Sequence, residues 1–84
     1  MAWKLSDAQA LYDWLDENLT DDEAEQVVLR LADFLDDPKG DPNTLPSPIH
    51  PLAVVWSVSV AKVELVLLIV EQFRMVRFLA ARRT

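Results

Sequence analysis

Apolar and polar residues follow three different patterns along the chain. Between residues 7 and 36 the apolar residues recur every three or four positions, the spacing of an amphipathic helix. Residues 38–51 contain all five prolines and the single glycine. From Leu52 to Val70 the chain is almost continuously apolar. This third pattern decides which fold class is predicted.

The first pattern predicts two helices joined by a short link. Ser6 opens an S-x-x-Q capping box before a helix expected over residues 7–18. The run T-D-D-E from Thr20 opens a second capping box, before a helix expected over 21–36. So short a link favours an antiparallel helical hairpin, whose outer faces would be acidic.

The proline-rich segment 38–51 is predicted to be a loop of extended and turn conformations. It has two interpretations. The loop could be a tether that lets the last element reverse direction. It could instead be a recognition segment, with Leu45 and Ile49 as apolar anchors on a proline-stiffened strand.

The apolar stretch can be read as helix or strand. Over residues 56–60 tryptophan and valine alternate with serine, which is typical of a strand. However, no proline or glycine interrupts 52–83, and the apolar residues from Val63 onward have helical spacing. We therefore predict one long helix, and the alternative is a strand over 53–60 followed by a helix.

The predicted fold class is all-α, in a single small domain over residues 1–84. It comprises an acidic helical hairpin (1–37), a proline-rich loop (38–51) and a long apolar and basic C-terminal helix (52–83).

The long helix is predicted to need a partner. A helix of about 30 residues is about 45 Å long, whereas a compact chain of this length has a radius of gyration near 12 Å, to within about 1 Å. Its apolar residues would surround the helix, and one hairpin cannot cover every side. We therefore expect a helical bundle completed by homodimerisation or by another protein partner. The predicted interface residues are Trp56, Val60, Val63, Leu67, Val70, Arg74 and Arg77.

Charge is distributed unevenly along the chain. Residues 1–38 carry eleven Asp and Glu against Lys4 and Arg30, a charge of −9, and residues 39–84 carry +3, which gives the net charge of −6. This balance argues against nucleic acid as a partner, because phosphates require Lys and Arg. Opposite charges at the two ends would attract each other, within one chain or between copies.

A membrane span is the competing interpretation of the apolar stretch. Residues 52–70 just match the minimum length of a spanning helix. Lys62 and Glu64 would each cost about 3 kcal/mol at its centre, roughly cancelling the gain from the apolar residues. The free energy of membrane insertion is therefore near zero, and a soluble chain is the preferred interpretation.

The sequence offers no arrangement of residues that suggests catalysis. There is no cysteine, and the single histidine, His50, lies in the loop without a second ligand or a nucleophile at a useful spacing. The nucleotide-binding glycine motifs are absent. No catalytic, cofactor-binding or metal-ligating residue is predicted, and the chain is not expected to be an enzyme.

The sequence therefore predicts a non-enzymatic protein–protein interaction module of the cytoplasm. It would act as an adaptor, assembly factor or small regulator that assembles through its C-terminal helix. The alternatives are a small subunit of a larger, membrane-associated complex, and a single-span membrane protein.

Overall fold

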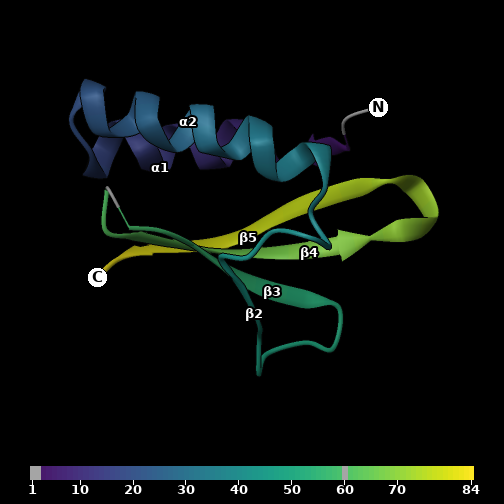
Figure 1. Ribbon diagram of the computed structural model, residues 1–84. Helices are drawn as coiled ribbons and strands as arrows, with labels where there is room; N and C mark the ends of the chain where they lie inside the picture. The colour runs from purple at the N-terminus through teal and green to yellow at the C-terminus, as the bar shows by residue number, and fades with distance from the viewer. Residues whose placement is uncertain (1–2, 60) are drawn as a thin grey trace.

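The computed structural model describes residues 3–59 and 61–84 and shows an α+β fold, so the all-α prediction is wrong. Two helices and five strands follow one another along the chain (Figure 1). In chain order the elements are β1 (Lys4–Ser6), α1 (Ala8–Asn18), α2 (Asp21–Asp36), β2 (Thr44–Pro46), β3 (Ala53–Val58), β4 (Val63–Val70), the 3₁₀ turn η1 (Glu71–Phe73) and β5 (Met75–Arg83).

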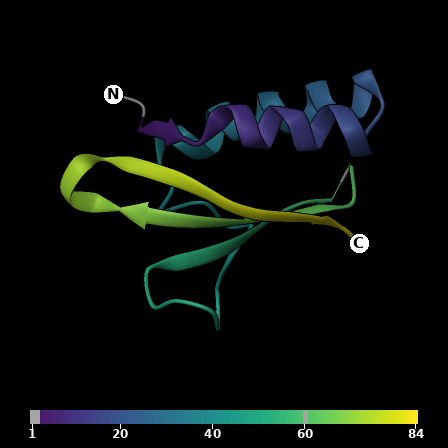
Figure 2. The same cartoon turned by 180° about the vertical axis from the view of Figure 1, so that it is seen from behind.

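The strands form one mixed sheet in the order β1-β5-β4-β3-β2. Strand β1 pairs in parallel with β5, and the other three pairs are antiparallel. Both helices lie side by side on one face of the sheet, and no helix of the described residues covers the opposite face (Figures 1 and 2). We call these the covered face and the open face.

The predicted long helix over 52–83 is replaced by β3, β4 and β5. Valine and isoleucine dominate the first two strands, and such β-branched side chains suit a pleated surface better than a helix. The two turns contain no glycine or proline; instead Lys62 (φ 54°) and Arg74 (φ 47°) adopt the left-handed conformation. The sequence therefore contains no glycine or proline that would indicate these turns. Strand β3 lies within the alternative strand 53–60, but the helix that the alternative placed after it is also wrong.

The helical hairpin is confirmed. Helix α2 spans 21–36 as predicted, and both hydrogen bonds of the capping box between Thr20 and Glu23 are present. The first capping box is wrong: Ser6 belongs to β1, and α1 starts after Asp7, whose φ is 60° and whose side chain makes no cap. Asp7 therefore serves as the tight corner between β1 and α1.

The core lies between the helices and the covered face. Alternate strand residues supply it, among them Trp56, Val63, Leu65, Leu67 and Val76, each at most 2% exposed. Leucines of α1 and the apolar stripe of α2 close it from the other side. The two helices thus cover the apolar residues on one face of the sheet. The predicted long helix, with apolar residues on every side, is absent, so the reason for expecting a second chain to cover it no longer applies.

The molecule also has no room for the predicted helix, because its largest dimension is 34 Å. In the described part of the chain, no helix combines the length and the hydropathy needed to cross a membrane.

Candidate functional site

Polar side chains on the open face gather in one row that crosses three strands. Ser57 of β3 pairs with Glu64 of β4, and Glu64 pairs with Arg82 of β5. The Arg82 guanidinium donates to Glu64 Oε1 from Nε at 2.9 Å and lies 2.8 Å from it through Nη2. The Glu64 side chain is 22% exposed and the Arg82 side chain 76% exposed, so the carboxylate is sheltered while the guanidinium faces solvent.

A β-bulge in β5 makes this row possible. Leu67 pairs with Phe78, but Val66 pairs with Ala80, so Leu79 is an extra residue in β5. A bulge of one residue reverses which side chains face which side of the sheet. Before the bulge Val76 faces the helices; after it, Arg82 faces the open side opposite Glu64.

A cavity of about 330 Å³ adjoins the Glu64–Arg82 pair. Its floor is the apolar row beside the polar one, formed by Val55, Val66 and Ala80. One wall is the proline-rich loop, through Pro48 and Ile49. The site thus combines an anion-binding guanidinium, a proton-accepting carboxylate and an apolar surface of the size of a small organic group.

Arg77 adds a further positive charge to the open face. It is paired in register with Leu68 of β4, and its Nε donates to Asp7 Oδ2 at 2.8 Å. Residues 53–84 carry five Lys and Arg against Glu64 and Glu71, a charge of +3. Residues 7–37 carry eleven acids against Arg30, a charge of −10. The acidic residues therefore belong to the helical layer, and the sheet is the basic layer.

The residues predicted to form an interface do not share one surface. Trp56, Val63 and Leu67 are buried in the core of the chain itself. Val70 is partly buried at the end of β4, and Arg74 is exposed in the turn before β5. Arg77 lies on the open face, and Val60 lies outside the described residues. A role for any of them in contacting a second chain remains a prediction.

His50 keeps the structural role expected for a loop residue. Its Nδ1 accepts a hydrogen bond from the backbone N–H of Leu52 at 3.0 Å. Among the described residues, no three histidine or acidic side chains gather closely enough to hold a metal ion.

Sequence reasoning missed the pair formed by Glu64 and Arg82. The two residues are eighteen positions apart and belong to no linear motif. The signal that could have revealed them is the alternation of valine and serine in β3, which indicates a sheet surface with one polar side.

Among known proteins, the chain is similar to solved structures of one fold. No protein-family model and no curated protein sequence matches the chain. Solved structures of the Escherichia coli toxin RelE do match. The isolated toxin is 21% identical with a TM-score of 0.74, covering 99% of this chain and 85% of RelE. A free variant with two arginines replaced by alanine is 23% identical with a TM-score of 0.71, covering 99% and 84%.

RelE is also seen with a protein partner. In the intact E. coli RelBE toxin–antitoxin complex the matched chain is 21% identical with a TM-score of 0.74, covering 99% of this chain and 98% of the other. The arginine variant was also solved bound to a peptide of the antitoxin RelB. RelE thus binds a protein partner, in line with the expectation of one here, whereas homodimerisation remains a prediction.

These matches establish that the chain has the RelE fold, and they correct two predictions. The helical adaptor, assembly factor or regulator predicted from the sequence is wrong, because the chain has the α+β fold of the toxin RelE and not an all-α fold. The prediction that the chain is not an enzyme is likewise contradicted by its likeness to the toxin RelE.

Proposed function

We propose that this chain is a RelE-type toxin that cleaves RNA on the open face of its sheet. The observation that carries the proposal is the fold match to RelE, an mRNA-cleaving toxin, across 99% of the chain. The Glu64–Arg82 pair supports it, because it supplies the two groups that phosphodiester cleavage needs at one place.

The proposed reaction uses the ribose 2′-hydroxyl as nucleophile. Glu64 takes the proton from this hydroxyl as the 2′-oxygen bonds to phosphorus, and the 5′-oxygen leaves and takes a proton from water. Arg82 turns its N–H groups from Glu64 to the phosphate and stabilises the charge that develops on the non-bridging oxygens. The Val55–Val66–Ala80 floor would lie under an adjacent unstacked base.

Charge favours the open face over the helices as the RNA-binding surface. Phosphates would be repelled by residues 7–37, with a charge of −10, and attracted to residues 53–84, with a charge of +3. An RNA substrate would reverse the sequence-based prediction that nucleic acid is not a partner, which used the charge of the chain as a whole. A net charge of −6 still predicts weak binding to free RNA, so the ribosome would supply most of the substrate affinity.

The test is a translation reaction with purified ribosomes, mRNA and the full chain, in which new RNA 5′ ends are mapped by primer extension. Glu64→Gln should lower the cleavage rate about 10²–10⁴-fold, and Arg82→Ala should lower it about 10²–10³-fold. Glu71→Gln is the matched control, because Glu71 also forms an exposed ion pair, with Lys39, but lies in the turn after β4 and outside the cavity. Cleavage that is absent in the wild type, or unchanged in Glu64→Gln, would contradict the proposal.

An antitoxin-like protein is the partner that the proposal implies, and the cytoplasm, where translation takes place, is the compartment it requires. Expression of the chain should arrest bacterial growth, and a screen of clones from its source genome should recover a protein that restores growth and copurifies with it. If the chain arrests growth but the screen recovers no such protein, the partner proposal is contradicted.

A further inference from the structure

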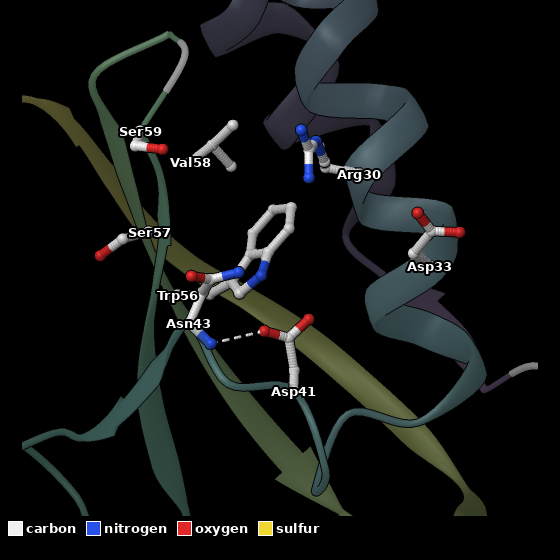
Figure 3. A pocket seen from close by; sticks show the side chains of 8 residues that line it. All are labelled: Arg30, Asp33, Asp41, Asn43, Trp56, Ser57, Val58 and Ser59. Atoms are coloured by element: carbon white, nitrogen blue, oxygen red, sulfur yellow. Dashed lines mark hydrogen bonds between the residues drawn. The ribbon is translucent and has the colours of Figure 1, made fainter.

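A second cleft lies at the edge where α2 meets β3 and shares no lining residue with the cavity beside Glu64 and Arg82. Its volume is about 80 Å³. Figure 3 shows Arg30 extending from α2 toward Trp56, Asp33 lying against α2, and Asp41 and Asn43 on the loop before β2. Neither Glu64 nor Arg82 lines it, so the proposed cleavage reaction does not use it.

Trp56 supplies the evidence that the cleft takes a ligand. The side chain is 2% exposed and packs on Phe34, with ring centroids 5.2 Å apart. Its Nε1–H is fully buried and has no hydrogen-bond partner among the described residues. Leaving such a donor unsatisfied destabilises the fold, and buried indole N–H groups usually have an acceptor. In Figure 3 this nitrogen lies on the side of the ring that faces Asp41 and Asn43.

The chemistry of the lining limits what the ligand can be. The indole and the Arg30 guanidinium only donate hydrogen bonds. The buried indole needs an acceptor atom on the ligand, and the exposed Arg30 can donate to the same acceptor group. Arg30 makes no ion pair within the part of the chain that the structure describes. Asp33 is exposed, and Asp41 Oδ1 accepts from the Asn43 backbone N–H at 2.8 Å. Both carboxylates can accept a further hydrogen bond from a donor, and they repel a simple anion. A metal ion cannot accept from an N–H and would be repelled by Arg30.

The ligand must therefore carry an acceptor end and a donor end within a few bonds of each other. The cleft is several times larger than the roughly 10–15 Å³ that one water needs, so it accommodates a molecule of several heavy atoms. We propose that it binds a small zwitterion, an α-amino acid with a minimal side chain. The carboxylate would accept from Trp56 Nε1 and Arg30, and the ammonium would donate to Asp41 and Asp33.

The test follows the indole N–H signals of the ¹⁵N-labelled full chain by nuclear magnetic resonance while glycine is added. Replacing Trp56 with Phe assigns its signal among those of the three tryptophans. The Trp56 signal should move saturably, while the signals of Trp3 and Trp14 stay in place and report an intact fold. Acetate and methylammonium, which each carry one half of the zwitterion, should bind at least about tenfold more weakly, since each loses charge-assisted hydrogen bonds.

Two variants decide whether the cleft is responsible. Arg30→Gln and Asp41→Asn should each weaken glycine binding about tenfold or more, because each removes one ionic contact. Arg74→Gln is the control, since Arg74 is an exposed arginine in the turn before β5, and should bind glycine as the wild type does. No saturable shift with glycine, an equal shift with acetate alone, or unchanged binding in Arg30→Gln would overturn the proposal.

Discussion

The two faces of the sheet are built from the same strands but have opposite properties. On β4, Val63, Leu65 and Leu67 face the helices and are at most 1% exposed, whereas the intervening residues Glu64 and Val66 face outward and are partly exposed. Alternation along a strand thus separates the residues that stabilise the fold from those available for chemistry. A substitution should therefore affect stability or activity depending on its face, even between adjacent residues.

The largest effect is expected in the core. Leu65→Ala removes a side chain that is 0% exposed and should lower the free energy of unfolding by about 2–5 kcal/mol. Val66→Ala, on the open face, should cost clearly less, because its side chain is only partly buried. Urea unfolding followed by circular dichroism measures both. Equal losses would show that the open face contributes to the core as much as the covered face does.

A smaller effect is expected at the start of α2. Thr20→Ala removes the hydroxyl that accepts from the Glu23 N–H at 3.3 Å and should destabilise the chain by about 1 kcal/mol. Thr20→Ser keeps the oxygen and should restore most of the loss in the same unfolding experiment. If both variants behave alike, the capping box does not stabilise the covering helices.

On the open face the stability effect should be smaller still. The Glu64–Arg82 pair is partly exposed, so Glu64→Gln should change the free energy of unfolding by no more than about 1 kcal/mol. Thermal unfolding of Glu64→Gln beside Leu65→Ala measures this directly. A loss as large as that of the core variant would assign Glu64 a structural role.

The smallest effect concerns pH. Arg83 at the end of β5 donates to Glu23 Oε2 at 2.9 Å and to the Asn18 carbonyl at 2.8 Å, which ties the strand to the helical layer. The backbone N–H of Thr20 lowers the pKa of Glu23 most, with its hydroxyl and Arg83 adding to the effect. Because the folded pKa is lowered, this carboxylate stabilises the fold above its ordinary pKa of about 4.3 and loses that contribution as pH falls through the lower value.

Acid titration of unfolding tests this prediction. Wild-type stability should fall below about pH 4 more steeply than that of Glu23→Gln, which lacks the titrating group. Parallel curves would show that the Glu23 carboxylate has no linkage to folding.

How far the sequence predicts this structure depends on whether a feature is local. Helix α2 was predicted to the residue because its capping box and apolar stripe are contained within that segment. The strands were missed because their turns use Lys62 and Arg74, residues that rarely adopt positive φ. Strand β1 was equally hidden, since its partner in β5 lies about seventy residues away: Leu5 pairs with Val76.

The candidate site was out of reach for the same reason. Glu64 and Arg82 meet only after β4 and β5 pair, and only because the bulge at Leu79 turns Arg82 to the open face. In the predicted helix, the side chains next to Glu64 would be those three and four residues away, and Arg82 is not among them.

The most direct test of the account compares two neighbouring substitutions, Glu64→Gln and Leu65→Ala, for RNA cleavage per folded molecule on translating ribosomes. Glu64→Gln should be fully folded but should cleave at least about 10²-fold more slowly. Leu65→Ala should be less stable yet should cleave like the wild type once its rate is corrected for the folded fraction. Wild-type cleavage by folded Glu64→Gln would contradict the assignment of chemistry to the open face.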